Sequence, residues 1–216
     1  MMPYATAQFD PCANSTTVRS IRAGATGPGE VAPARRFDRR YTEQLACGGR
    51  TVYLHTLRPS DRAALLAAFE RTSPQTRYRR FFAPKSALSE REVRFLTEVD
   101  GERHVALGAA WMNPQGQFEG LAVARFVRLP DDPSTAEPAI VVIDAWQGRG
   151  LGRALLERLV AAARERGIDR FACSVVAGNG PMLRLLREYP GARFRAEDGV
   201  IHVTLDLEAT AASIAA

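Results

Sequence analysis

A run of alternating glycines at the start of a helix constrains the fold of this chain most. In the stretch DAWQGRGLGRALLERL, residues 144–159, Gly148, Gly150 and Gly152 stand at every second position. A tight strand-to-helix turn rarely needs more than one or two glycines. The backbone N–H groups that open a helix are unpaired and carry partial positive charge, and bare glycines let a phosphate approach them closely. The pattern therefore favours an anion-binding loop over a turn that is only structural.

Two common phosphate-binding loops do not fit these residues. A Walker loop requires Gly-Lys followed by Ser or Thr, whereas Arg153 and Ala154 follow Gly152 here. A dinucleotide fingerprint requires the spacing G-x-G-x-x-G at the first strand–helix turn of a longer parallel series. This chain has G-x-G-x-G, late in the sequence and beside a single parallel crossover. The spacing and the context exclude both nucleotide loops.

Hydrophobic spacing on both sides of the loop predicts a mixed sheet with helices. The near-continuous apolar run at 138–143 indicates a strand covered on both faces, and the helix after the loop ends near Gly167. A strand at 168–177 then gives a parallel pair with a right-handed crossover, while hairpins at 104–129 and 192–207 give antiparallel pairs. The predicted order is a strand, three helices, two strands, then strand, helix, strand, helix and two strands.

Cap signals locate the helices that precede the first hairpin. Ser60 is expected to cap a helix over 61–71. Ser89 and Glu92 form an S-x-x-E capping box for the helix that follows them. A short helix is predicted within 73–82.

The chain is expected to hold one folded domain with flexible ends. Residues 1–48 lack apolar periodicity and contain Gly, Pro, Ala and Thr in irregular order, which is typical of a flexible leader. The arginine cluster at 35–40 is expected to be solvated rather than to bind an anion or a partner. The folded domain is predicted over 51–207, and residues 208–216 are predicted to form a C-terminal tail.

Composition excludes several classes of protein. Hydrophobic residues make up 46% and charged residues 25% of the 216 residues, as in an ordinary soluble globular domain. No apolar run approaches the roughly 18 residues of a membrane span, and the N-terminus lacks a secretory pattern, so a cytoplasmic location is expected. The three cysteines and three histidines are scattered, which predicts no metal site. The net charge of +5 is not gathered in one basic run, so nucleic-acid binding is not expected.

The glycine loop resembles a known signature. QGRGLG, residues 147–152, is similar to the Q/R-x-x-G-x-G/A motif of the GNAT superfamily of N-acetyltransferases, with Gln147, Gly150 and Gly152 at the motif positions. The flanking segments, AEPAIVVIDAW before it and VVAGNGPMLRLLRE after it, resemble the acetyltransferase domain of bacterial protein-lysine acetyltransferases. The likeness covers about residues 51–207.

The resemblance implies the GNAT fold, an α/β fold whose mixed central sheet of about 6–7 strands is splayed at the acyl-CoA site and flanked by about 4–5 helices. The acyl donor would be acetyl-CoA, with no metal. Backbone N–H groups after the strand would hold the pyrophosphate, and the strand itself would pair with the pantetheine arm. The residues implied in acetyl-CoA binding are Val141, Val142, Ile143, Gln147, Gly148, Arg149, Gly150, Leu151, Gly152, Arg153 and Asn179.

For several of these residues, a purely structural role is an alternative to binding acetyl-CoA. Arg149 and Arg153 could lie near the phosphates, or they could be solvated arginines at a helix start. Asn179 could lie near the CoA arm, cap the last helix, or do both. Phe81 and Phe82, in the segment TRYRRFF that the resemblance places at the acceptor groove, are expected to pack in the core.

Transfer of acetyl to an amine needs a base, because a lysine has a pKa of about 10.4 and only roughly one molecule in a few thousand is neutral at pH 7. The resemblance assigns this role to Glu137, whose structural alternative is an exposed carboxylate at a strand end. A backbone N–H near Val141 or Val142 would hold the oxyanion. Leu186 stands where many members of the family have the tyrosine that protonates the leaving thiolate, so Tyr189 or water would have to serve.

The expected function is therefore an acetyl-CoA-dependent N-acetyltransferase that modifies an amine, with a protein lysine preferred as acceptor. Acetylation of a small amine by the same fold and a non-catalytic acyl-CoA sensor are the alternatives within the family. A basic nucleic-acid binder is the alternative from another class.

Overall fold

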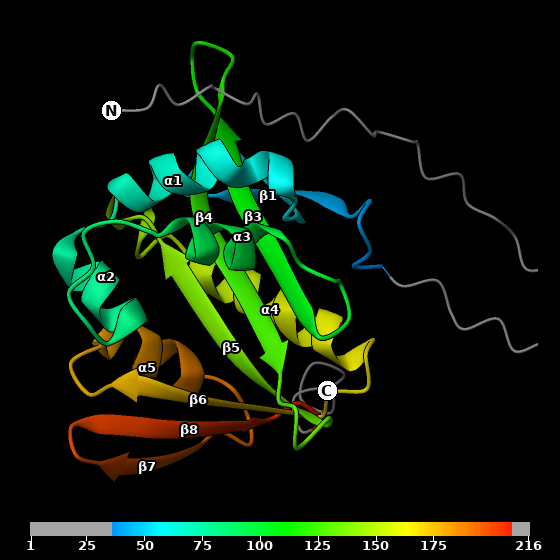
Figure 1. The fold of residues 1–216 in the computed structure, drawn as a ribbon, viewed down its shortest axis with the longest axis vertical. Coiled ribbons are helices and arrows are strands. Elements are labelled where there is room, and N and C mark those ends of the chain that lie inside the picture. Colours follow the sequence, from blue (N-terminus) through cyan, green and yellow to red (C-terminus); the bar gives the residue numbers. More distant parts are fainter. Residues whose placement is uncertain (1–35, 209–216) are drawn as a thin grey trace, which may run out of the picture.

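The computed structural model describes residues 36–208, which form one mixed sheet flanked by helices (Figure 1). The strands are β1 (Thr42–Cys47), β2 (Arg50–Thr56), β3 (His104–Met112), β4 (Phe118–Arg128), β5 (Thr135–Val142), β6 (Arg170–Val176), β7 (Arg193–Glu197) and β8 (Val200–Asp206). The helices are α1 (Arg62–Glu70), α2 (Pro74–Phe81), α3 (Glu90–Thr97), α4 (Leu151–Arg164) and α5 (Gly180–Arg187), with short 3-10 helices η1 (Pro59–Asp61) and η2 (Asp144–Trp146).

The sheet is almost entirely antiparallel, in the order β1-β2-β3-β4-β5-β6-β8-β7. The exception is the parallel pair β5–β6, which is joined only at Thr135↔Arg170 and Ala136↔Phe171. Beyond Ala136 the two strands separate, and the β6-β8-β7 part of the sheet turns away from β5 (Figure 1). The predicted mixed, splayed sheet is confirmed, with eight strands in the described residues instead of about 6–7.

The additional strand lies inside the predicted leader. β1 pairs with β2 along its whole length, and Phe37 is 1% exposed in the core. The prediction of a flexible leader up to residue 48 is therefore wrong for residues 36–48, because an edge strand with one buried face carries few apolar side chains and gives a weak pattern. Residues 1–35 of the predicted leader and residues 209–216 of the predicted tail lie outside the described residues.

The two faces of the sheet are covered by different helices. α1, α2 and α3 lie over one face, where α1 contacts β4 and α2 contacts β5, and α4 packs on the other face against β3, β4 and β5 (Figure 1). The inner face of α4 buries leucines at helical spacing, Leu151, Leu155, Leu156 and Leu159. This packing fixes the start of α4 beside the end of β5, which is where the glycine loop connects them.

Of the two helix caps predicted before the first hairpin, the structure contains the one at Ser89 and differs at Ser60. The Ser89–Glu92 capping box is present, with the Ser89 N–H donating to the Glu92 carboxylate at 2.8 Å. Ser60 does not cap α1, because Pro59 opens a 3-10 turn that carries the chain one residue further before the helix begins. The Asp61 carboxylate there accepts from the Arg58 N–H at 2.7 Å.

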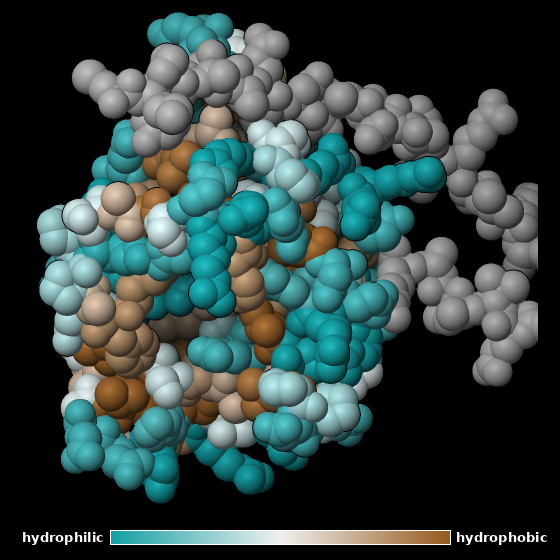
Figure 2. Space-filling model, viewed as in Figure 1, coloured by the Kyte–Doolittle hydropathy of each residue, from teal (hydrophilic) through white to brown (hydrophobic). Residues whose placement is uncertain are grey.

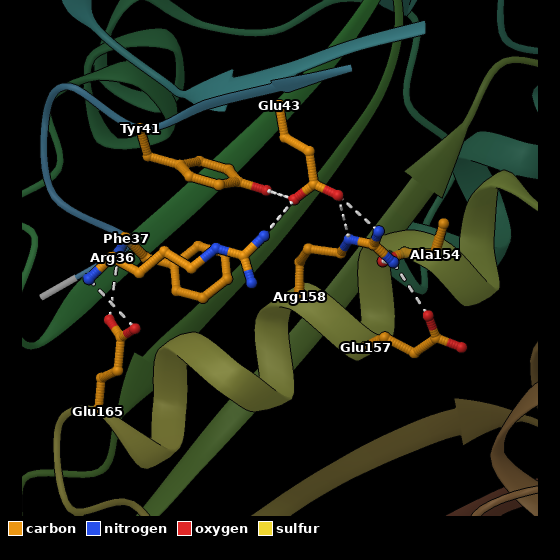
Figure 3. A network of polar contacts seen from close by, with 8 residues as sticks. All are labelled: Arg36, Phe37, Tyr41, Glu43, Ala154, Glu157, Arg158 and Glu165. Carbon is orange, nitrogen blue, oxygen red and sulfur yellow. Dashed lines mark hydrogen bonds and ion pairs between the residues drawn. The ribbon is translucent and has the colours of Figure 1, made fainter. Parts of the chain in front are cut away.

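Polar contacts tie the beginning of the described chain to α4 (Figure 3). The Glu43 carboxylate accepts hydrogen bonds from Arg158 at 2.6 Å, from the Tyr41 hydroxyl at 2.7 Å and from Arg36 at 2.8 Å. The Glu165 carboxylate accepts from the Arg36 N–H at 3.2 Å. Although burial opposes it, hydrogen bonding by Arg158 and Tyr41 holds the pKa of Glu43 below its ordinary value. β1 is thus fastened to the helix that leads away from the glycine loop.

Two features are absent from residues 36–208. None of the helices there has both the length and the apolar character that crossing a membrane demands. Likewise, no group of three or more His, Cys, Asp or Glu side chains in this part of the chain is arranged to hold a metal ion.

Candidate active site

A cleft of about 650 Å³ opens where β5 and β6 separate. Its walls come from β5, the glycine loop, the start of α4, β6, α5 and the end of α2. Figure 2 shows this face of the molecule hollowed between α2 and the β6-β8-β7 part of the sheet, with apolar side chains along the hollow. The predicted site residues that line the cleft are Glu137, Val141, Val142, Gln147, Gly148, Gly150, Gly152, Arg153 and Asn179.

The glycine loop has backbone angles that explain two of its three glycines. Gly148 has φ +71° and Gly150 has φ +86°, and a Cβ added at either position would meet nothing within 4 Å. A side chain would be strained at both positions by the backbone alone. Gly152 has no positive φ, and its added Cβ would meet only Leu185 at 3.7 Å, an ordinary contact. The fold therefore does not require a glycine at position 152. Gly152 lies on the wall of the cleft.

Gly150 is the N-cap of α4 and provides no side chain to bond the first-turn N–H groups. By helix geometry the amides of the first turn have no partner within the helix, and they carry the positive end of its dipole. Gly148, Gly150 and Gly152 line the cleft around these amides. The loop thus presents a set of backbone donors to the cleft, as an anion site requires.

A polar cluster anchors the loop to the N-terminus of α2. The Asp144 carboxylate accepts from the Ser73 N–H at 2.7 Å, from the Ser73 hydroxyl at 2.7 Å and from the Thr76 hydroxyl at 2.9 Å. Gln147 donates to the Val142 carbonyl at 3.0 Å and to the Thr76 hydroxyl at 3.2 Å. Burial opposes ionisation of Asp144, but its hydrogen bonds to Ser73 and Thr76 hold its pKa below the usual range. Sequence reasoning missed Asp144, Ser73 and Thr76, because these partners are about 70 residues apart.

The two arginines of the loop have different surroundings. Arg149 does not line the cleft: its guanidinium lies 5.2 Å from the centre of the Trp146 ring, and its side chain packs beside Gly48 in the β1–β2 turn. Arg153 does line the cleft, and it forms an ion pair with Glu188 at the end of α5. Of these two loop arginines, only Arg153 is therefore placed to put a side-chain charge into the cleft.

Two other predicted residues have buried side chains. Leu151 and Ile143 are each 1% exposed and belong to the core. Neither side chain lines the cleft, so any contact of these residues with a ligand would be through the backbone.

Glu137 is exposed on β5, opposite Val127 of β4, at the mouth of the cleft. Pro138 follows it within the strand without breaking the register with β4. Burial raises the pKa of the Cys173 thiol on β6 to about 12, and the charge of Glu137 adds to this effect. Burial lowers the pKa of Arg80 on α2, and the charge of Glu137 opposes that shift. Glu137 is therefore electrostatically coupled to both neighbouring walls.

The last helix contributes a cap and a buried face. Asn179 is the N-cap of α5, and its side chain accepts from the Met182 N–H at 3.4 Å. Since Asn179 also lines the cleft, its capping role leaves it available to a ligand. Leu186 is fully buried, and burial raises the pKa of the Tyr189 hydroxyl to about 12. Tyr189 does not line the cleft, so the structure does not place a substitute tyrosine there.

A smaller cavity of about 60 Å³ adjoins the cleft, between α1–α3 and strands β4 and β5. Arg80 and Phe81 of α2 line both spaces. Phe82 lines the cleft and is 42% exposed, so the expectation that it packs in the core is wrong. The reason is that α2 ends at Phe82 in a left-handed conformation, so this side chain does not continue the helical face on which Phe81 contacts the Phe69 ring of α1.

This arrangement of a splayed sheet and a helix-start amide loop is matched by a known family. The model of the acetyltransferase (GNAT) family matches residues 54–189. The chain therefore belongs to the GNAT family and to its class of N-acetyltransferases.

Individual relatives make the likeness more specific. The chain is 32% identical over 163 residues to acetyltransferase Pat of Mycolicibacterium smegmatis, a match that covers 74% of this chain and 46% of that protein. It superposes on the crystal structure of the GNAT domain of S. lividans PAT with a TM-score of 0.67 and 34% identity, covering 76% of this chain and 96% of that one. The chain thus spans about half the length of the Mycolicibacterium protein and nearly all of the S. lividans domain.

A more distant structure shares the fold. The structure of yncA from Salmonella typhimurium, solved with its cofactor acetyl-CoA, has a TM-score of 0.57 at 18% identity over 72% of this chain and 94% of that one. At this identity the likeness concerns the fold alone.

Proposed function

We propose that this chain transfers an acetyl group from acetyl-CoA to an amine, and that the amine is the side chain of a protein lysine. The observation that carries the proposal is the cleft between β5 and β6, which ends at an unpaired amide loop. Membership of the GNAT family supports the reaction, and the resemblance of the segments on either side of the glycine loop to bacterial protein-lysine acetyltransferases supports a protein acceptor.

The cofactor would lie along the free edge of β5. Past Ala136 none of the described strands pairs with this edge on the β6 side, so its backbone groups are available to the pantetheine amides, as in strand addition. The pyrophosphate would bind the amides of residues 148–152, with Arg153 beside it. Arg149, Leu151 and Ile143 would contribute backbone atoms at most, because their side chains do not line the cleft.

Glu137 would act as the general base. A lysine ammonium must lose a proton before its nitrogen can attack the thioester carbonyl, and a carboxylate at the cleft mouth can accept that proton directly or through one water. The new C–N bond forms as the oxyanion is held by a backbone N–H near Val141 or Val142. The C–S bond then breaks, and water protonates the departing thiolate, since Leu186 is apolar and Tyr189 lies outside the cleft.

The test is a turnover assay with acetyl-CoA over a panel of lysine peptides and small amines, followed by mass spectrometry of the acceptors. The proposal predicts thiol release that depends on the peptide, with one acetyl group on a lysine nitrogen. Turnover with small amines and with no peptide would favour a small-molecule acetyltransferase. Acetyl-CoA binding without turnover of any acceptor would favour an acyl-CoA sensor.

A further inference from the structure

The cavity between α1–α3 and the sheet has an unusual charge balance. Its lining is mostly apolar, yet it includes three arginines, Arg77 and Arg80 of α2 and Arg125 of β4. None of the lining residues in the described part of the chain is an aspartate or a glutamate. Buried cations without a compensating anion are costly, so each of these arginines needs an explanation.

Arg77 is explained by the fold. Its guanidinium donates to the Phe69 carbonyl and the Thr72 hydroxyl, each at 3.1 Å, and to the Ser86 carbonyl at 3.1 Å. It also stacks over the Phe69 ring at 4.2 Å. These contacts use its donors to join α1, α2 and the segment before α3, which is a structural role.

Arg125 has a donor that the fold leaves unused. Its side chain is on the buried face of β4 at 3% exposure, and one terminal nitrogen donates to the Leu96 carbonyl at 2.6 Å. The other terminal nitrogen, Nη1, is buried and has no hydrogen-bond partner among residues 36–208. Burial, and then the charge of Arg80, lower the pKa of Arg125 to about 9, which still leaves it cationic at neutral pH.

Arg80 connects this cavity to the cleft. It lines both spaces and makes no hydrogen bond to any described residue, although its guanidinium lies 5.2 Å from the Phe81 ring. Glu137 is the carboxylate whose charge reaches it. Arg80 and Arg125 therefore line the same small cavity, and no carboxylate in its described lining balances their charge.

We propose that Arg80 and Arg125 bind a carboxylate carried by one of the two substrates, with that carboxylate seated in the small cavity that both arginines line. The proposal deepens the function proposed above and rests on it. Two guanidinium groups with free donors are well suited to a carboxylate, whose two oxygens accept charge-assisted hydrogen bonds.

The size of the cavity limits how the carboxylate is presented. About 60 Å³ is the liquid volume of roughly two waters, which accommodates a carboxylate at the end of a short chain and no peptide segment. The carboxylate could therefore come from the far end of a dicarboxylic acyl group on CoA, or from a small chain on the amine acceptor. The two sources share the same chemistry and need separate measurements.

The first experiment compares matched substrates on the unmodified protein. One arm uses succinyl-CoA against butyryl-CoA with the same lysine peptide. The other arm uses acetyl-CoA with 4-aminobutanoate against 4-aminobutanamide. The proposal predicts that kcat/KM favours the carboxylate by about tenfold or more in at least one arm, as expected for a buried charge-assisted contact. No preference in either arm would overturn it.

The second experiment removes one arginine. Arg125→Met should abolish the preference for the carboxylate while kcat/KM for the uncharged partner changes by less than about threefold, and Arg125→Lys should restore part of the preference. Arg91→Met, at an exposed position on α3, is the matched control and should change neither value. A preference that survives Arg125→Met unchanged would contradict the proposal.

Two further measurements keep the outcome clear. If circular dichroism shows that Arg125→Met does not fold, the same ratios are measured for Arg80→Met, at a half-buried position on α2. Calorimetric titration with succinyl-CoA and with butyryl-CoA compares the affinities of the two esters, and so measures the contribution of Arg80 and Arg125 to binding without relying on catalysis. Failure of the proposed function would appear as no turnover with any lysine peptide, whereas failure of this inference would appear as equal binding and equal turnover of the matched pairs.

Discussion

At the scale of single residues, the proposed mechanism gives Glu137 the most specific role, because this exposed carboxylate lines the cleft and its charge acts on Arg80 of α2 and on Cys173 of β6. Glu137→Gln keeps the shape and removes the proton acceptor. We expect kcat/KM for acetyl transfer to fall roughly 100-fold or more, the usual contribution of a general base, with acetyl-CoA affinity unchanged within about twofold.

The control for this variant is Glu197→Gln, an exposed carboxylate of β7 that does not line the cleft. Steady-state kinetics on both variants, with calorimetry for affinity, make the comparison. Equal activity of Glu137→Gln and the unmodified protein would show that Glu137 is not the general base.

His104 is a second residue with a testable property. Burial, and then the charge of Arg125, lower the pKa of His104 from 6.5 to about 4, although Asp100 opposes the shift. Between these two pH values the unfolded chain binds a proton at this residue and the folded chain does not. The free energy of unfolding should therefore decrease as the pH falls from about 6.5 towards 4.

His104→Phe removes this titration while retaining a ring that can stack on Phe95, whose centre lies 4.8 Å from that of His104. Urea denaturation at pH 7 and pH 5 should show a smaller loss of stability in the variant than in the unmodified protein. Identical losses in the two proteins would mean that His104 does not contribute to the pH dependence.

At the scale of elements, the proposed acetyl-CoA binding depends most on the connection between β5 and α4, since the backbone angles of its glycines leave the amides at the start of α4 open to the cleft. Gly150→Ala introduces a Cβ at φ +86° on the open side of the loop. The strain of about 1 kcal/mol should lower stability, and the altered amide directions should weaken acetyl-CoA binding about tenfold or more.

Gly116→Ala is the matched control for this prediction. Gly116 has φ +76° in the turn between β3 and β4, and an added Cβ there also meets nothing within 4 Å. Thermal unfolding should show a similar loss of stability in both variants, while calorimetry should show weaker acetyl-CoA binding only for Gly150→Ala. Equal acetyl-CoA affinities of the two variants would show that the glycine loop does not bind acetyl-CoA.

Local signals explain which elements the sequence could predict. The glycine loop, the Ser89–Glu92 box and the Asn179 cap act within a few residues of each other, so their patterns are readable and the structure contains all three. The contact of Asp144 with Ser73 and the unused donor of Arg125 depend on pairing across the fold. No local pattern carries such information, which is why these parts of the site could not be predicted.

At the scale of the whole molecule, the described chain is one sheet whose first strand was not expected. The polar network of Glu43 with Tyr41, Arg36 and Arg158 fastens that strand to α4 (Figure 3). The residues of β1 are mostly polar and include few apolar ones, so their pattern in the sequence is typical of a flexible leader. Tertiary packing of Phe37, not local propensity, makes this segment part of the domain.

Glu43→Ala tests how much this attachment contributes. Removal of a half-buried carboxylate that accepts several hydrogen bonds should lower the free energy of unfolding by about 1–3 kcal/mol. Urea denaturation gives this value, and Glu208→Ala, an exposed carboxylate near the end of the described chain, is the control. A change below about 0.5 kcal/mol would show that β1 does not depend on the network.

The central claim is that the cleft between β5 and β6 binds acetyl-CoA through the amide loop at the start of α4. Calorimetric titration of the full chain with acetyl-CoA tests it most directly. We predict saturable binding of one acetyl-CoA per chain, competed by free CoA. The absence of saturable heat, or binding that free CoA does not compete, would contradict it.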